Sequence, residues 1–540
     1  MTKKDKTVNE PIKSYAPGSI ERKNLQKKYD QMAAQKIEIP LIINGKDVKT
    51  GLTRNCIMPH DHQHVLAIFH NAGKEEVEKS IQSSMEIWKT WSNTPLTERT
   101  KIFRKAADLL KGPWRDTINA ATMLNQSKNA FQAEIDSACE LIDFFNFNAQ
   151  YAEDIYSSQP LISPSGTHNY LEYRPLEGFV FAITPFNFTS IAGNLPTAPA
   201  ILGNVVLWKP ASSAVLPCYY LMLLLKEAGL PDGVINFIPG SGGTVGDPVL
   251  INKNLAGVHF TGSTETFQHI WKTIGTNIQN YKTYPRIVGE TGGKDFCLAH
   301  DSADVKELAT AMIRGAFEFQ GQKCSAMSRA YIPSNIWEDL KTEYLSKLKT
   351  LKVGSPRDFT NFVNAVIDKP AFDSIVEFIE YSRSSDDAEI ISGGQYDDRK
   401  GYFIQPTTII TSDPHFRTME EEIFGPVLTI YIYEPSNWKM TIDLVNNTSP
   451  YALTGCVMGK DEIAVKEAKN GLLHSAGNFY INDKPTGAVV GQQPFGGSRA
   501  SGTNDKAGSD LNLQRWISIR TVKETFETPT DYRYPFLEED

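Results

Sequence analysis

The sequence predicts an α/β protein with a parallel sheet in each of two domains. Short apolar runs alternate with stretches of helical spacing, first between residues 178 and 289 and again after residue 300. This alternation is typical of βαβ units, in which helices cover both faces of a parallel sheet. The chain has 540 residues, which is too long for one ordinary core, so two or three domains are expected.

The elements follow one another in a clear order. Residues 1–50 are polar and lysine-rich, and we expect them to lie on the surface. Residues 75–157 have the spacing of helices, most clearly from Phe131 to Phe145. Further helices are predicted at 221–228, 304–319 and 334–351. Strands are predicted at 178–183, 204–208, 234–238, 256–260 and 329–332. The aromatic tail after about residue 508 is expected to pack on a partner subunit.

The composition limits the kind of partner and the location. A net charge of -8 argues against nucleic acid or an anionic membrane as the main partner. The sequence contains no run of about 18 apolar residues, so no membrane span is predicted. The six cysteines form no CxxC motif, which favours a reducing compartment. The first residues resemble neither a signal nor a transit peptide, so a cytoplasmic location is expected unless a presequence precedes this numbering.

Cys324 and Glu290 are the candidate reactive pair. Cys324 follows a glycine-containing turn at the end of a predicted amphipathic helix, and Glu290 lies at the edge of the glycine-rich turn in segment 289–294. A thiol nucleophile and a carboxylate base suit chemistry that makes a thioester and then hydrolyses it. Taken alone, a cysteine is more often a small buried apolar residue.

Other polar residues follow predicted strands. Asn187 has an amide that is suited to stabilising an oxyanion, or to bonding its own turn. Lys209 lies at the carboxyl end of a strand, where open α/β sheets bind ligands, although a surface lysine is the simpler interpretation.

Two glycine-containing turns are candidate phosphate sites. The turn from Gly240 to Gly246 departs from GxGxxG spacing, and Ser263 follows Gly262 at the start of a predicted helix. Simple tight connections and helix capping explain them equally well. His60, His62 and His64 alternate, but without cysteines or an acidic cluster beside them we expect solvated side chains and no metal site.

Taken together, these motifs resemble the aldehyde dehydrogenase superfamily over nearly the whole chain. The matching segments, in chain order, are 185–187, 207–210, 260–263, 290–294, 321–324, 421–427 and 494–497. Segments 187–189, 203–210, 478–484 and 491–505 are most similar to the 1-pyrroline-5-carboxylate dehydrogenase branch, which oxidises glutamate 5-semialdehyde.

The resemblance implies a role for each catalytic residue. Cys324 attacks the aldehyde, and its own N–H and the Asn187 amide hold the oxyanion. After hydride transfer to the nicotinamide, Glu290 activates the water that hydrolyses the thioester. The implied reaction is NAD-dependent oxidation of L-glutamate 5-semialdehyde to L-glutamate, in proline breakdown.

The resemblance also implies the binding residues. For the dinucleotide these are Thr184, Lys209, Gly240, Gly246, Gly262, Ser263, Glu422 and Phe424. Many NAD-preferring relatives have an acid where this chain has Ser212, so NAD is favoured and NADP is less firmly excluded. For the substrate, Ser325, Gly487 and Ala488 are implied at the α-carboxylate, Glu140 at the α-ammonium, and Phe188 and Phe495 along the aliphatic chain.

The implied architecture has a Rossmann-like cofactor domain, an α/β catalytic domain and a small β flap that makes at least a dimer. We expect the cofactor domain at 51–159 and 178–289, the catalytic domain at 290–507, and the flap at 160–177 and 508–540. A mitochondrial matrix location is implied if the source is eukaryotic. The rival functions are an aldehyde dehydrogenase for another semialdehyde such as succinate semialdehyde, a catalytically silent binding protein, and a reductase of acyl phosphates.

Overall fold

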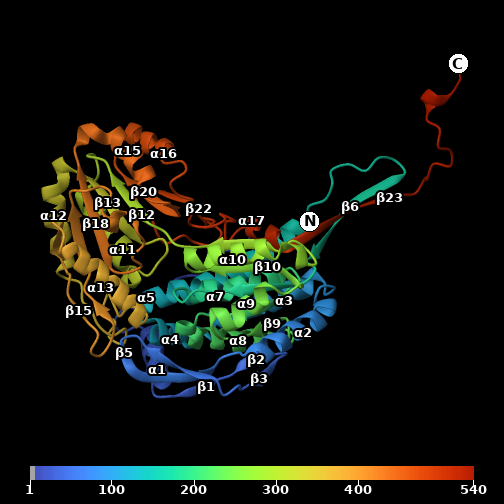
Figure 1. The fold of residues 1–540 in the computed structure, drawn as a ribbon, viewed down its shortest axis with the longest axis horizontal. Coiled ribbons are helices and arrows are strands. Elements are labelled where there is room, and N and C mark those ends of the chain that lie inside the picture. Colours follow the sequence, from blue (N-terminus) through green and yellow to red (C-terminus); the bar gives the residue numbers. More distant parts are fainter. Residues whose placement is uncertain (1–5, 540) are drawn as a thin grey trace.

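Two seven-stranded sheets organise the molecule, one in each of two lobes (Figure 1). The computed structural model describes residues 6–539. In the first sheet the strand order is β11–β10–β7–β8–β9–β2–β3. These strands are Arg286–Glu290, Leu255–Thr261, Phe179–Ile183, Val205–Lys209, Ile235–Phe237, Leu41–Ile43 and Lys46–Val48. The pairs from β11 to β9 are parallel, so the predicted βαβ arrangement is confirmed.

The second sheet has the order β14–β17–β18–β13–β12–β20–β21. Its strands are Ala388–Ser392, Thr407–Thr411, Val427–Tyr433, Met327–Pro333, Asp295–Ala299, Thr454–Met458 and Asn478–Ile481. All its pairs are parallel except the edge pair β14–β17. Large apolar clusters on the two sheets are separate, and this separation gives each lobe its own core.

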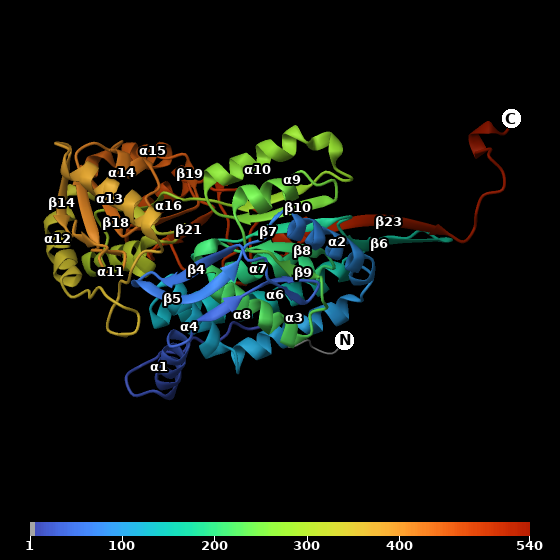
Figure 2. The same cartoon turned by 60° about the horizontal axis from the view of Figure 1, so that its bottom comes forward.

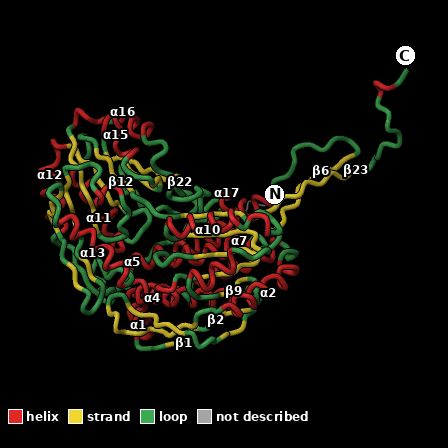
Figure 3. Tube along the Cα trace, viewed as in Figure 1, coloured by secondary structure: helices red, strands yellow, loops and turns green. Residues whose placement is uncertain are grey.

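Helices flank both sheets (Figures 2 and 3). The longer helices of the first lobe are α1 Ile20–Ala33, α2 Lys74–Trp91, α3 Leu96–Lys111, α4 Arg115–Gln126, α6 Glu140–Ser157, α7 Thr189–Ile201, α8 Val215–Ala228 and α10 Thr264–Thr276. Those of the second are α11 Val305–Phe317, α12 Ser334–Leu348, α13 Lys369–Arg383, α15 Trp438–Asn447 and α16 Glu462–Gly471. Helix α8 ends at Gly229 with φ +99°, as its sequence predicts.

The helix predicted around Phe131–Phe145 is interrupted by a wider turn. Helix α5 (Ala130–Ala133) leads into a π-helical turn at Glu134–Cys139, and α6 begins at Glu140. Such turns occur often at functional sites. The register changes immediately before Glu140, one of the implied substrate residues.

The N-terminal segment differs from the surface role expected for residues 1–50. Strand β2 pairs with β9 through Ile42 and Phe237, and Leu41 and Ile42 are fully buried. The apolar run from Ile39 to Ile43 covers an edge strand that would otherwise be exposed. Strands on either side of β2 and β3 in the chain form a separate three-stranded sheet in the order β1 (Ile37–Ile39), β5 (Asp61–His70) and β4 (Thr53–Met58).

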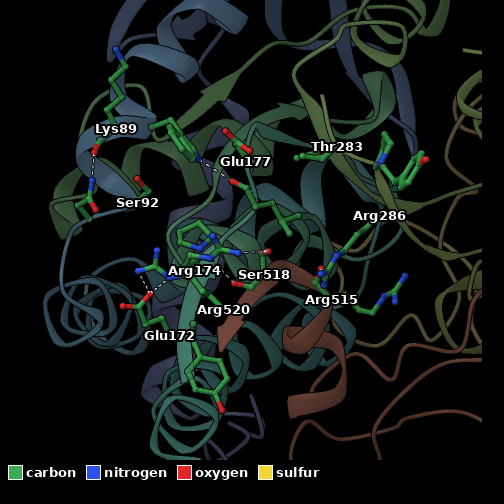
Figure 4. A pocket seen from close by; sticks show the side chains of 18 of the residues that line it. Lys89, Ser92, Glu172, Arg174, Glu177, Thr283, Arg286, Arg515, Ser518 and Arg520 are labelled. Atoms are coloured by element: carbon green, nitrogen blue, oxygen red, sulfur yellow. Dashed lines mark hydrogen bonds and ion pairs between the residues drawn. The ribbon is translucent and has the colours of Figure 1, made fainter. Parts of the chain in front are cut away.

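A two-stranded ribbon projects from the first lobe. It pairs β6 (Thr167–Pro175) with β23 (Ile517–Thr525) in antiparallel register, and the C-terminal residues continue beyond it (Figure 1). Beside the base of the ribbon lies an open groove of about 1350 Å³ (Figure 4). Within residues 6–539, no helix is both long enough and apolar enough to cross a membrane.

Candidate active site

Cys324 lies in a strained loop between α11 and β13. The backbone φ values of Phe319, Gln320 and Gly321 are +50°, +57° and +68°, in a region that residues other than glycine rarely adopt. Each non-glycine residue there costs about 1–3 kcal/mol unless neighbouring contacts hold it. Such contacts are present here. Gln320 Nε2 donates to the carbonyls of Ser127 at 3.0 Å and Ala365 at 2.9 Å.

Two glycines let other segments approach this loop. A Cβ on Gly293 would lie 2.2 Å from the carbonyl oxygen of Cys324, and one on Gly321 would lie 2.1 Å from that of Gly425. Any larger residue would clash with the backbone at either place. The first glycine brings the segment after Glu290 onto the thiol loop, and the second brings the segment after Glu422 and Phe424.

Asn187 meets the thiol loop from the first lobe. It follows β7, and its Nδ2 donates to the carbonyl of Gln322 at 3.0 Å. The Gln322 side chain is in turn fixed by the Ile367 N–H, which donates to Oε1 at 2.9 Å. Because an amide nitrogen has two hydrogens, Asn187 retains one for a ligand.

Glu290 ends β11 with its carboxyl group turned inward. Oε2 is buried and has no hydrogen-bond partner among the described residues. Burial raises the pKa of Glu290 well above its usual value, and the backbone N–H of Gly497 and the charge of Lys506 offset this only in part. The residue therefore holds a proton more readily than an exposed glutamate does.

A cavity of about 920 Å³ opens beside Cys324. Seven of the nine implied dinucleotide residues line it, together with Asn187 and Cys324: Thr184, Lys209, Gly246, Gly262, Ser263, Glu422 and Phe424. They come from the segments at the carboxyl ends of β7, β8, β9 and β10 and from the second lobe. This edge of a parallel sheet is where open α/β folds bind ligands.

The cavity has the donors that a dinucleotide needs. Ser263 caps α10 by accepting from the Thr266 N–H, and Gly242, Gly243 and Gly246 lie on a second helical turn at the cavity wall. The Lys209 ammonium group makes no hydrogen bond or ion pair with any described residue, and burial lowers the Lys209 pKa to about 8. An unpaired cation and two helix starts fit phosphate and ribose groups.

Two implied dinucleotide residues lie outside the lining of this cavity. Gly240 is packed against Val245 and Ala72, where a Cβ would lie 2.5 Å from a Val245 methyl carbon. Ser212 begins the short helical turn Ser212–Ala214 after Lys209. Gly240 thus has a packing role here, and the candidate phosphate contacts come from Gly242 to Gly246.

The implied substrate residues come from several segments near Cys324. Ser325 Oγ lies 2.8 Å from Thr486 Oγ1, which brings in the loop of Gly487 and Ala488. Glu140 accepts a hydrogen bond from Ser190, two residues after Phe188. Phe495 precedes Gly496, where a Cβ would lie 2.9 Å from Glu290 Oε1.

Three buried groups near this region were not anticipated from the sequence. Lys128 is fully buried, pairs with Asp136 at 2.8 Å and lies 4.4 Å from the ring centre of Phe188. Asp295 Oδ2 has no partner among the described residues, although Oδ1 accepts from the Thr454 N–H. A lone charged residue in a short segment gives no sign in the sequence that folding will bury it.

His60 contradicts the prediction of solvated histidines. It is buried, and its ring nitrogens lie 2.8 Å from the Tyr29 hydroxyl and 3.1 Å from Ser127 Oγ. His62 and His64 bond the carbonyls of Asp398 and Ala33. His60, in the turn before β5, and His62 and His64 on β5 thus all make contacts between elements.

The family follows from this site and from sequence comparison. A profile of the aldehyde dehydrogenase family matches residues 48–522. The chain belongs to the aldehyde dehydrogenase family. A mitochondrial delta-1-pyrroline-5-carboxylate dehydrogenase of Dictyostelium discoideum is 52% identical over 532 residues, which cover 98% of this chain and 95% of that protein.

Solved structures of other aldehyde dehydrogenases agree with the fold. The delta-pyrroline-5-carboxylate dehydrogenase from Mycobacterium tuberculosis bound with NAD has a TM-score of 0.96 and 48% identity, and the match covers 100% of this chain and 99% of that one. The Thermus 1-pyrroline-5-carboxylate dehydrogenase with bound NAD has a TM-score of 0.91 and 31% identity, with 97% and 100% covered.

The electrostatics of this aldehyde dehydrogenase site favour a neutral thiol. Burial raises the pKa of Cys324 well above its usual range, and the nearby carboxylates of Asp295, Glu290 and Glu422 raise it further. Only the thiolate is strongly nucleophilic, so the fraction of reactive sulfur at neutral pH is small.

Alkylation of Cys324 should therefore rise with pH without a plateau below about pH 9. Below the pKa of a thiol, the thiolate fraction grows about tenfold per pH unit. The rate of iodoacetamide labelling, followed by mass spectrometry from pH 6 to 9, checks this. Cys324→Ser supplies the background from the other cysteines, all of which are buried. A plateau near pH 7 would show a preformed thiolate instead.

Proposed function

We propose that this chain oxidises L-glutamate 5-semialdehyde to L-glutamate with NAD⁺, in proline breakdown. The observation that carries the proposal is the meeting of Cys324, Asn187 and Glu290 beside a cavity with dinucleotide-binding features. Similarity to delta-1-pyrroline-5-carboxylate dehydrogenases along almost the whole chain supports the substrate.

Cys324 begins the proposed reaction. Its sulfur bonds to the aldehyde carbon, the C=O double bond becomes a single bond to an oxyanion, and the thiol proton leaves to Glu290 or water. The backbone N–H of Cys324 and the free hydrogen of Asn187 Nδ2 stabilise the oxyanion. Each such donor typically contributes about 10²–10³ in rate.

The proposed cofactor residues are Lys209, Ser263, Glu422 and Phe424, with the turn from Gly242 to Gly246 at the phosphates. When bound, NAD⁺ supplies the acceptor for the hydrogen of the substrate carbon and its electron pair. Phe424, which has φ +56° beside Gly425, is held against Phe186 in an edge-on contact. This contact fixes one wall of the cavity next to Cys324. Ser212 places no acid near Lys209, so NAD is proposed without a strong barrier to NADP.

Glu290 completes the reaction by activating water. The Glu290 carboxylate takes a proton from water as the water oxygen attacks the thioester carbon. The carbon–sulfur bond then breaks, and the proton passes from Glu290 to the sulfur, which releases the acid and restores the Cys324 thiol. Burial favours this role, because a raised pKa makes Glu290 a stronger base than an exposed glutamate.

The substrate's charged end is proposed to lie between two sets of contacts. Gly487 and Ala488 offer backbone N–H groups to the α-carboxylate. Glu140 faces the α-ammonium, and burial together with Asp136 raises the Glu140 pKa to about 7. A bound ammonium would favour the ionised form of Glu140. Phe188 and Phe495 are proposed to flank the methylene groups.

Substitution of the two reactive residues should separate the two halves of the reaction. Cys324→Ala should abolish NADH formation, because no thioester can form. Glu290→Gln should still give a burst of NADH, and then a steady rate lower by at least 10²-fold, on the order of a general base's contribution. Stopped-flow absorbance measures both. A steady rate equal to wild type in Glu290→Gln would assign the base to another group.

Glu140→Gln should distinguish the proposed substrate from another semialdehyde. Loss of a charged partner should lower kcat/KM for glutamate 5-semialdehyde by about 10–100-fold, the range for a hydrogen bond to a charged group. Values for succinate semialdehyde, which has no ammonium group, should change less than about twofold. NADH absorbance with a panel of semialdehydes, each with NAD and NADP, measures this. Equal losses on both substrates would support the rival enzyme.

We also propose that the ribbon contacts a second copy of the chain. A two-stranded ribbon alone is marginally stable in water. The ribbon, the loop before it and the tail leave large apolar side chains exposed: Leu161, Ile162, Ile519, Phe526, Tyr532, Tyr534 and Phe536. The tail is acidic, whereas arginines from several elements line the groove at the ribbon's base (Figure 4). This charge difference supports a contact between copies.

Removal of residues 526–540 should weaken self-association. Light scattering after size-exclusion chromatography should show a dimer or larger species for the full chain. The shortened chain should dissociate at concentrations at least tenfold higher. Val8→Ala, at an exposed position outside the ribbon and tail, is the control. An unchanged mass across the dilution series would show that the tail is not part of the interface.

For the compartment, we propose the mitochondrial matrix if the source is eukaryotic and the cytoplasm otherwise, following the mitochondrial relative.

A further inference from the structure

An N-terminal arm, defined here as residues 6–15, lies against the helices beside the candidate substrate site. Arg115 Nη1 donates to Glu10 Oε1 at 2.6 Å, and Nη2 donates to the carbonyl of Pro11 at 3.0 Å. The Tyr15 hydroxyl donates to Glu134 Oε2 at 2.7 Å. These contacts are mostly buried, and Arg115 and Glu134 are almost fully enclosed. The arm is therefore a fixed part of the first lobe.

Asn9 is the residue of the arm that contacts the loop after β21. Its Nδ2 donates both to Asp143 Oδ2 at 2.8 Å and to the carbonyl of Val490 at 2.7 Å. Its Oδ1 accepts from Gln492 Nε2 at 2.9 Å. One amide thus joins helix α6 to residues 486–493, here called the carboxylate loop.

The two segments joined by Asn9 carry opposite halves of the proposed recognition site. Asp143 lies one turn after Glu140 on α6, so the bond to Asn9 fixes the part of the helix that presents Glu140. The carboxylate loop contains Gly487 and Ala488. Its other end is tied to the residue after the nucleophile, because Thr486 Oγ1 bonds Ser325 Oγ.

We propose that Asn9 is a positioning residue that sets the distance between the proposed α-carboxylate and α-ammonium contacts. This inference rests on the proposed function for its substrate. Its physical basis is that both amide hydrogens and the amide oxygen of Asn9 are used, each on a different partner. The Glu10 N–H also donates to Asp143 Oδ1 at 2.8 Å, so the arm holds both oxygens of that carboxylate.

Asn9→Ala should affect recognition more than chemistry. Without the amide, the carboxylate loop can move relative to Glu140, so KM for glutamate 5-semialdehyde should rise about tenfold, the effect of one to two hydrogen bonds. The kcat should change less than about twofold, and kcat/KM for propanal, which has neither charged group, should not change. Steady-state NADH formation measures all three.

A paired substitution separates the loop contact from docking of the arm. In Asn9→Asp with Asp143→Asn, the new amide at 143 can donate to the new carboxylate at 9, and the Glu10 N–H still has an acceptor. The carbonyl of Val490 then faces a carboxylate and lacks its donor. Thermal stability should recover relative to Asn9→Asp alone, whereas the raised KM should persist. Recovery of KM would overturn the proposal, because arm docking would then suffice.

Two controls and one independent readout complete the test. Val8→Ala, at an exposed neighbouring position, should leave every parameter unchanged, and Tyr15→Phe should lower stability without changing the ratio of the two substrates' kcat/KM. Hydrogen exchange of residues 486–493 should accelerate in Asn9→Ala. Unchanged exchange, or equal losses on both substrates, would overturn the proposal. A different outcome would separate the two proposals. If exchange is faster in Asn9→Ala but the wild-type enzyme does not prefer glutamate 5-semialdehyde, the proposed function is rejected and the positioning role of Asn9 stands.

Discussion

The close approach of the Gly293 backbone to the carbonyl of Cys324 is the contact on which the site depends. Gly293 lies in the segment after β11, and Cys324 lies in the loop before β13. A Cβ added to Gly293 would lie 2.2 Å from the carbonyl oxygen of Cys324, which is too close for any residue larger than glycine. Without this approach, Glu290 would not lie close enough for its charge to raise the pKa of Cys324. The second approach, between Gly321 and Gly425, brings Phe424 to the same place. Catalytic geometry here is set by backbone contacts, and the reactive side chains depend on them.

Much of the fold could be predicted from the sequence because its determinants are local. Buried parallel strands such as β7 and β8 are short apolar runs that end at polar residues, and Gly229 stops α8 by its left-handed conformation. The positions of Cys324, Asn187 and Lys209 after such elements also follow from local signals. What those signals left open was whether each residue was functional or ordinary. Only the joint order of the motifs favoured one interpretation.

The rest could not be predicted because it depends on contacts between distant residues. Asn9 and Val490 are 481 residues apart, and a polar N-terminal segment gives no indication that one of its amides will join helix α6 to a loop near the other end of the chain. His60 is similar, since it lies in the turn between β4 and β5 and is bonded by the distant residues Tyr29 and Ser127. The place of Gly240 beside the dinucleotide stays a prediction, and its motif gave no indication that the Val245 side chain would pack against it.

The charges around Cys324 suggest why the site keeps its sulfur neutral. Three carboxylates near the thiol oppose its ionisation, yet one of them, Glu290, is proposed to activate water later in the cycle. A carboxylate placed for the second step thus necessarily disfavours the thiolate needed in the first, because two negative charges in a buried site repel each other. Protonation of Glu290 relieves the conflict, and burial favours that protonated form because it raises the Glu290 pKa. If the thiol proton passes to Glu290 as sulfur attacks, the negative charge moves to the substrate oxygen beside Asn187. The repulsion between the Cys324 thiolate and the Glu290 carboxylate is relieved by this transfer, which favours the first step. Glu290 must lose the proton again before it can act as the base in the second step.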